Sequence, residues 1–98
     1  MKRSDALAKL KTCSDAVRDL GATSLYLFGS TARDEAHESS DVDVFIDYER
    51  GGKFSLLDLV DIKLLLEAGL GVAVDVTTRN SLDPLLRDDI VNSSVRVF

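Results

Sequence analysis

Residues 29–47, GSTARDEAHESSDVDVFID, place a Gly-Ser pair ten residues before a run of alternating aspartates. The pair directly follows a short apolar run, LYLF, at residues 25–28. In DVDVFID, residues 41–47, the aspartates alternate with apolar residues, so they share one face of a predicted strand. These acids face either water on the open side of a sheet or a positive charge that the protein holds.

The N-terminal part of the chain predicts a helix, a strand and a second, short helix. Apolar residues at helical spacing predict a helix that Ser4 caps and Gly21 ends. Residues 24–28 predict a buried strand, and residues 31–37 predict a short helix.

The C-terminal part continues this alternation. After a loop at residues 48–54, Ser55 and Asp58 form the pattern of a capping box for a helix over residues 55–68, with Gly69 as its stop. A strand is predicted at residues 72–77. A helix from Pro84 to about residue 91 and a last strand at residues 94–98 follow.

The element order predicts an α+β fold with a small mixed β-sheet and helices packed on it. The 98 residues match the commonest size of one domain, so residues 1–98 are expected to form a single domain. No run of apolar residues approaches the roughly 20 that a membrane-spanning helix needs, and no signal peptide is recognised.

Composition narrows the possible functions. A net charge of −5 argues against general nucleic-acid binding, which depends on neutralising phosphates with Lys and Arg. The single cysteine, Cys13, excludes an internal disulfide and fits a reducing cytoplasm. A cytoplasmic protein without membrane contact is therefore expected.

The spacing of polar residues predicts a site at one edge of the sheet. Gly29 and Ser30 end the first strand, and Asp41 and Asp43 begin the second, so they meet if these strands are antiparallel neighbours. Asp75 interrupts a valine-rich strand on the face opposite its valines. Carboxylates that share one face repel one another unless a proton or a cation compensates them. Oxygen ligands without a His or Cys cluster favour Mg²⁺ or Mn²⁺.

The Gly-Ser turn adds phosphate chemistry to the predicted metal site. Its backbone N–H groups and the Ser30 hydroxyl are donors for phosphate oxygens, and Gly29 permits a close approach. The predicted site is therefore a metal-assisted phosphate site.

The pattern of Gly-Ser, ten residues, Asp-x-Asp and a later Asp in a strand resembles the nucleotidyltransferase superfamily of DNA polymerase β. Within it, GSTAR, SDVDVFID and VDVTT most resemble the minimal nucleotidyltransferases, antitoxins of paired HEPN–nucleotidyltransferase systems. The resemblance covers nearly the whole chain, except the loop at residues 48–54.

The resemblance implies an antitoxin that transfers AMP from ATP to a hydroxyl, expected to be a tyrosine, of a HEPN ribonuclease toxin encoded nearby, and thereby silences it. Two Mg²⁺ ions are implied, with Mn²⁺ as an alternative. The implied roles are metal binding and catalysis by Asp41, Asp43 and Asp75, and nucleotide binding by Gly29, Ser30 and Arg33. Asp75 is the expected general base for the acceptor hydroxyl.

Alternatives stay open at several positions. Relatives usually carry Gly after Arg33, where this chain has Asp34, a charge unfavourable near a triphosphate unless it points away. Arg33 itself fits either a phosphate contact or a surface ion pair, and Asp47 is expected to face water. The rival functions are an antitoxin that masks its toxin by binding alone and nucleotide transfer to a small molecule.

Overall fold

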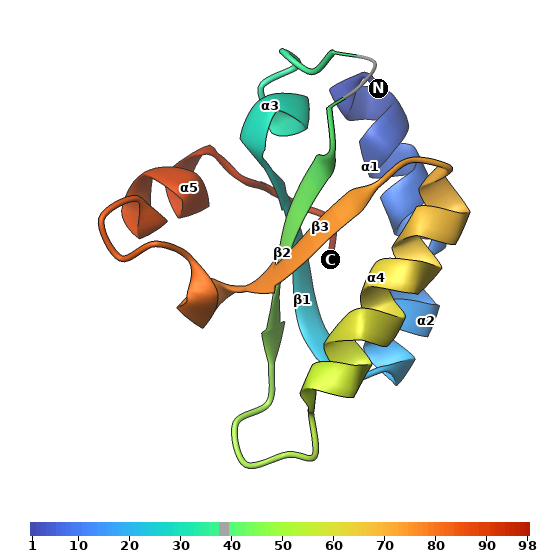
Figure 1. Cartoon of the computed structure of the whole chain (residues 1–98), viewed down its shortest axis with the longest axis vertical. Helices are drawn as coiled ribbons and strands as arrows, with labels where there is room; N and C mark the ends of the chain where they lie inside the picture. The colour runs from blue at the N-terminus through green and yellow to red at the C-terminus, as the bar shows by residue number, and fades with distance from the viewer. Residues whose placement is uncertain (38–39) are drawn as a thin grey trace.

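The computed structural model describes residues 1–37 and 40–98, and within them four strands form one sheet in the order β3-β2-β1-β4 (Figure 1). The strands are β1 (Ala22–Phe28), β2 (Val42–Tyr48), β3 (Val74–Thr78) and β4 (Val95–Arg96). β1 pairs antiparallel with both β2 and β4, whereas β2 pairs parallel with β3. The predicted mixed sheet is confirmed.

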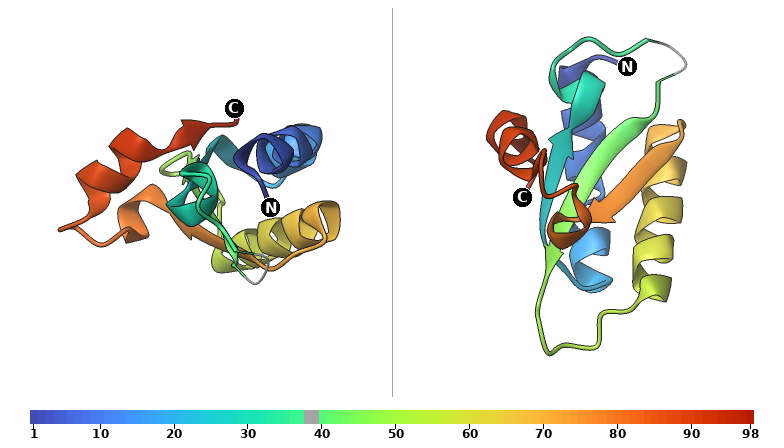
Figure 2. Two further views of the ribbon diagram at one scale, coloured as in Figure 1. Left: turned by 90° about the horizontal axis from the view of Figure 1, so that it is seen from above. Right: turned by 60° about the vertical axis from the view of Figure 1, so that its left-hand side comes forward.

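Helices lie on both sides of this sheet. One side carries α1 (Arg3–Thr12), α2 (Ser14–Asp19) and α4 (Leu56–Leu70), and the other carries α5 (Arg87–Ser93), as Figure 2 shows. The single turn α3 (Gly29–Ala32) follows β1, and the 3-10 helix η1 (Arg79–Ser81) follows β3. None of the helices in the described ranges is long and apolar enough to cross a membrane.

The main core lies between the sheet and helices α1, α2 and α4. Its fully buried members alternate along the strands and recur along the helices; they include Leu10, Val17, Leu25, Leu27, Val44, Ile46, Ile62 and Leu66. The alternation leaves the intervening residues of β1, β2 and β3 on the opposite face of the sheet. That second face carries the predicted site.

The N-terminal helix differs from the prediction because it is two helices, α1 and α2. The Thr12 hydroxyl donates a 2.6 Å hydrogen bond to the Lys9 carbonyl, and the Cys13 N–H donates to Leu10, three residues back. A threonine hydroxyl that bonds to a nearby carbonyl competes with the regular helical pattern, and three-residue bonds tighten the turn. The helix therefore stops at Thr12 and restarts at Ser14.

Helix α4 begins as predicted but ends two residues later than expected. The capping box of Ser55 and Asp58 is present at its start. The predicted stop at Gly69 is wrong, because α4 continues to Leu70 and Gly71 ends it with φ +74. A Cβ at Gly69 would lie 2.7 Å from the Cys13 sulfur, so Gly69 allows close helix packing instead.

Two other helices are shorter than predicted. The helix expected at residues 31–37 is the single turn α3, because Asp34 adopts φ +59, which a right-handed helix does not allow. Helix α5 begins at Arg87, since Pro84 lies in a turn in which Asp83 accepts hydrogen bonds from Leu85 and Leu86.

Candidate active site

The turn between β1 and α3 approaches β2 closely. Gly29 has φ +75, and a Cβ added to it would collide with Oδ2 of Asp43 and lie 3.2 Å from its Cγ. Phe28, just before the turn, is paired directly with Asp43 across the antiparallel strands. The condition on which the predicted site depends, that these strands are antiparallel neighbours, is therefore met, and Gly29 lies against Asp43.

A second carboxylate lies beside Asp43 on the next strand. Asp75 on β3 is paired with Asp43 in the parallel register of β2 and β3. Asp41 directly precedes β2 and is exposed. Three neighbouring strands thus bring Gly29, Asp43 and Asp75 together, with Asp41 at the entrance of β2.

The electrostatics of this cluster are unfavourable in the protein alone. Burial raises the pKa of the Asp43 carboxyl above its ordinary value of 3.8, Asp75 and Asp41 raise it further, and Arg33 lowers it. Among the described residues, neither Asp43 nor Asp75 forms an ion pair. The Asp43 carboxylate is therefore poised to bind a cation.

The residues fit a divalent cation that arrives with its phosphate ligand. Within residues 1–37 and 40–98, no group of three or more His, Cys, Asp or Glu side chains is arranged to hold a metal ion. Asp43 and Asp75 are instead a pair of carboxylates. Mg²⁺ is commonly held by one or two carboxylates together with substrate phosphates. The pair fits that mode of binding, and phosphate oxygens would supply further ligands.

Arg33 lies at the end of α3, close enough to act on the charge of Asp43. Its Nε donates a 3.1 Å hydrogen bond to the Glu35 carboxylate, and both side chains are mostly exposed. Exposed ion pairs contribute little stability. The guanidinium can therefore exchange Glu35 for a phosphate at little cost, so the surface ion pair and a phosphate contact are compatible.

The Asp34 carboxylate binds the start of helix α1. Its Oδ1 accepts a 2.9 Å hydrogen bond from the backbone N–H of Arg3, the first residue of α1. A carboxylate at this helix end is stabilised by the N–H groups and by the helix dipole. The Arg3 guanidinium also donates to the Ala32 carbonyl at 3.3 Å. Asp34 therefore attaches α1 to the end of α3.

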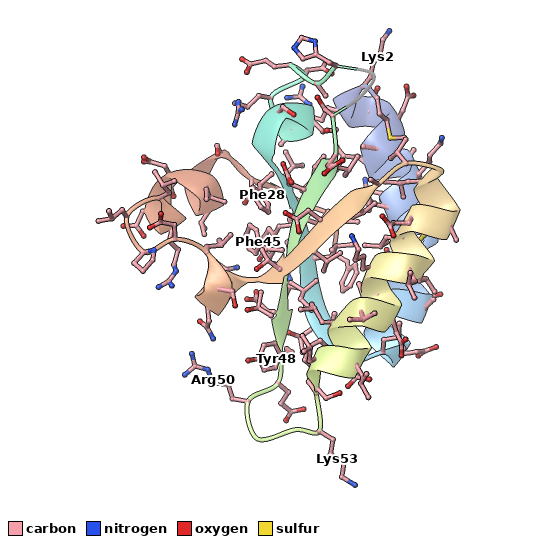
Figure 3. All side chains as sticks on the ribbon, viewed as in Figure 1. Lys2, Phe28, Phe45, Tyr48, Arg50 and Lys53 are labelled. Carbon is pink, nitrogen blue, oxygen red and sulfur yellow. The ribbon has the colours of Figure 1, made fainter. Side chains whose placement is uncertain are left out.

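The prediction that the Asp47 side chain faces water is wrong. Arg79 donates to its two carboxylate oxygens at 2.8 and 3.0 Å. The same guanidinium lies over the rings of Tyr26 and Phe45, 5.0 and 5.1 Å from their centroids. Figure 3 labels Phe45 on the face of the sheet toward α5. Asp47 is thus part of a compensated structural cluster.

Sequence reasoning did not find the cavity beside Gly29. The cavity measures about 290 Å³ and lies between the turn after β1 and helix α5. Leu86 and Ile90, four residues apart, contribute its apolar wall. Their helical spacing was the available signal, but nothing in the sequence places α5 against the Gly-Ser turn.

Comparisons with known proteins agree with this geometry. The family model of the nucleotidyltransferase domain matches residues 10–97. MJ0435 of Methanocaldococcus jannaschii, which is named as a protein adenylyltransferase, is 50% identical over 72 residues, or 74% of this chain and 75% of the relative.

Two solved structures share the fold of this chain. One, described as a minimal nucleotidyltransferase, is 35% identical, covers 97% of this chain and 95% of its own, and has a TM-score of 0.83. The other is a complex of a tri-AMPylated Shewanella oneidensis HEPN toxin with its nucleotidyltransferase antitoxin. The matched chain of that complex is 18% identical to this chain, and the match covers 90% of this chain and 68% of the matched one. The two share the fold with a TM-score of 0.62.

Proposed function

Because this chain belongs to the family of nucleotidyltransferase domains, we propose that it transfers AMP from ATP to a hydroxyl group of a partner protein. The family expected from the sequence motifs is confirmed. One observation carries the proposal: Gly29, at the start of a helical turn, touches Asp43, which is itself paired with Asp75. A phosphate-holding turn and a carboxylate pair therefore occupy the same place.

Each predicted site residue has a role in this proposal. Gly29 and Ser30 hold the β- and γ-phosphates of ATP, and Arg33 contacts a phosphate oxygen after leaving Glu35. Asp43 and Asp75 would hold the divalent cations together with the phosphates, and Asp41 would join them only if it moves closer than in the free protein, where these three acids do not form a metal-binding group among the described residues. When bound, two Mg²⁺ ions, or Mn²⁺ in their place, supply positive charge for the attacking and leaving oxygens.

Asp75 is the proposed general base. It is exposed on β3, which is an edge strand, so an acceptor hydroxyl can reach it from solvent. Asp75 takes the hydroxyl proton as the oxygen attacks the α-phosphorus, and the bond to pyrophosphate breaks. The products are an AMP ester of the acceptor and pyrophosphate.

The proposed acceptor is a tyrosine of a HEPN-type toxin encoded nearby. The AMPylated toxin in the complex with a protein of the same fold supports a HEPN toxin as the acceptor protein, and the tyrosine is our expectation from the sequence motifs. This chain also offers a surface for a protein partner, since Leu56, Leu57 and Leu64 on α4 are 74%, 76% and 57% exposed. The same surface supports the second candidate function, in which the chain masks the toxin by binding alone.

Incubation with ATP labelled at the α-phosphate, Mg²⁺ and the HEPN-type partner tests the proposal. Label is expected on the partner, is lost with Asp43→Asn, and is retained with Asp47→Asn, the matched control on the same strand. Neutralisation of the toxin that persists in Asp43→Asn without any label would instead support masking.

A further inference from the structure

The cavity beside the Gly-Ser turn shares Gly29 and Arg33 with the proposed phosphate site, and its remaining lining residues have no role in the proposed reaction. It lies between the end of β1, turn α3 and helix α5, and Figure 3 shows Phe28 on the side of the sheet toward α5. The residues that matter for its chemistry are Phe28, Gly29, Arg33, Leu86, Asp89 and Ile90.

The walls of the cavity suit a flat, partly polar group. Phe28 at the end of β1 supplies an aromatic ring, and Leu86 and Ile90, at the start of α5 and within it, supply aliphatic surface. Stacking of a nucleobase on an aromatic side chain contributes about 1–3 kcal/mol and tolerates any base. The volume of about 290 Å³ is near the lower limit of ligand pockets, which suits a nucleoside better than a larger ligand.

Asp89 is the polar group available on the α5 wall. The Ser93 hydroxyl, which also borders the cavity, already donates to the carbonyls of Asp89 and Ile90, at 2.8 and 3.3 Å. The Asp89 side chain is exposed and belongs to none of the ion pairs found among the described residues. An ionised carboxylate only accepts hydrogen bonds, so it favours a ligand that presents an N–H donor.

The strand order separates this cavity from the acceptor side of the site. Asp43 on β2 is paired with Asp75 on β3 and with Phe28 on β1, so these two residues flank it on opposite sides. An acceptor that gives its proton to Asp75 approaches from the β3 side. The β1 side, where the cavity adjoins Gly29, is left for the rest of the nucleotide.

We propose that this cavity binds the base and ribose of the nucleotide, with the base against Phe28 and its amino group donating to Asp89. The inference rests on the proposed nucleotide transfer and adds a specificity-determining residue, Asp89, to it. Adenine presents a 6-amino donor, whereas hypoxanthine presents an oxygen acceptor that faces a carboxylate unfavourably. The site therefore prefers ATP over inosine triphosphate.

Calorimetric titration of the full chain tests the preference by binding alone. ATP, inosine triphosphate and inorganic tripolyphosphate are titrated in the presence of Mg²⁺. ATP is expected to bind about tenfold more tightly than inosine triphosphate, because a mismatched polar pair costs on the order of 1–3 kcal/mol. In Asp89→Asn the ratio falls to about twofold, since an amide both donates and accepts.

Asp88→Asn is the matched control. Asp88 is an exposed neighbour in the same helix and does not border the cavity, so the tenfold preference is expected to remain. Melting temperatures of both variants verify that each is folded.

Four results overturn the inference. Equal binding of ATP and inosine triphosphate, or a preference unchanged by Asp89→Asn, excludes Asp89 as the specificity-determining residue. If tripolyphosphate still binds in that case, the proposed phosphate and metal site is unaffected. Loss of AMP transfer in Ile90→Glu with unchanged ATP affinity assigns the cavity to the acceptor instead. Absence of binding by all three ligands removes the proposed function and this inference together.

Discussion

Two aspartates on one face of β2, Asp43 and Asp47, have opposite surroundings. Asp47 is held by Arg79 through hydrogen bonds of 2.8 and 3.0 Å, and its side chain is 30% exposed. Asp43 lies against Gly29 and beside Asp75, and its pKa is raised by burial and by neighbouring carboxylates. The same residue type on the same strand is thus compensated at one end and uncompensated at the other.

This difference separates a structural acid, Asp47, from the acid that we propose to bind a cation, Asp43. The fold supplies a cation for Asp47, so nothing external is needed there. It supplies like charges to Asp43, which costs stability unless a ligand brings positive charge. Functional sites commonly retain such unfavourable arrangements at the expense of stability.

The largest expected contrast is in catalysis. Asp43→Asn is expected to lower the initial rate of AMP transfer by at least about 100-fold, since it removes charge stabilisation at the reacting phosphate. Asp47→Asn is expected to keep the rate within about threefold. Rates are measured as label incorporated into the partner. Comparable losses in both variants would show that the two ends of β2 do not differ in function.

The close approach between Gly29 and Asp43 is tested with two glycines of nearly equal φ. Gly29 and Gly71 have φ values of +75 and +74, but a Cβ would meet Asp43 at the first and nothing within 4 Å at the second. Both alanine variants incur strain of about 1–2 kcal/mol. Gly29→Ala is expected to lose about 1–3 kcal/mol more through overpacking.

Urea unfolding of both variants measures this difference. Equal free energies of unfolding would mean that the contact between the turn and Asp43 is relaxed at no cost.

At the other end of β2, removal of the Asp47 charge is expected to lower stability. Asp47→Asn is expected to lower the free energy of unfolding by about 1–3 kcal/mol, because a hydrogen-bonded charge pair loses its acceptor charge. Asp15→Asn is the control, since Asp15 pairs with Arg18 at 3.3 Å with its own side chain 99% exposed. Exposed pairs contribute about 0–1 kcal/mol, so little change is expected. Thermal unfolding that affects both variants equally would contradict the assignment of Asp47 as structural.

The smallest expected effect concerns pH. The folded-state pKa of Asp43 lies above its unfolded value of 3.8, with Asp75, Asp41 and Arg33 as the charged groups that act on it. The free energy of unfolding therefore falls as the pH rises past 3.8, the loss is complete above the folded-state pKa, and no penalty exists well below 3.8. Asp43→Asn is expected to stabilise the protein at pH 7 by less than about 1 kcal/mol, because solvent screens a half-exposed group.

The control for this prediction is the same variant near pH 3, where the gain disappears because the carboxyl is protonated in both states. Destabilisation by Asp43→Asn at pH 7 would show that the carboxylate is already compensated in the free protein.

Much of the fold could be predicted from local patterns. The alternation in residues 41–47 predicted β2, and Ser55 with Asp58 predicted the start of α4 correctly. Some errors came from local hydrogen bonds, such as that of Thr12 with Lys9, and one came from a contact with a distant segment. Gly69 resembles a helix stop, but Cys13 packs against it and the helix continues to Leu70.

In the candidate site too, some contacts could be predicted from the sequence and others could not. The contact of Gly29 with Asp43 could be anticipated, because the Gly-Ser pair ends the first predicted strand and Asp41 and Asp43 begin the next one. The pairing of Asp47 with Arg79 could not, since 32 residues separate them in the sequence. The cavity formed with α5 was equally inaccessible, because it depends on where the segment after β3 returns to the sheet.

The sequence by itself determined which residues share a face of each strand and which types of ligand they can offer, because side-chain alternation and functional groups are local properties. Only the tertiary structure decided that Asp47 meets Arg79 while Asp43 meets Asp75 and the glycine turn. The physical reason is that the charge state and role of a carboxylate depend on its neighbours in space, and the strand order β3-β2-β1-β4 sets those neighbours.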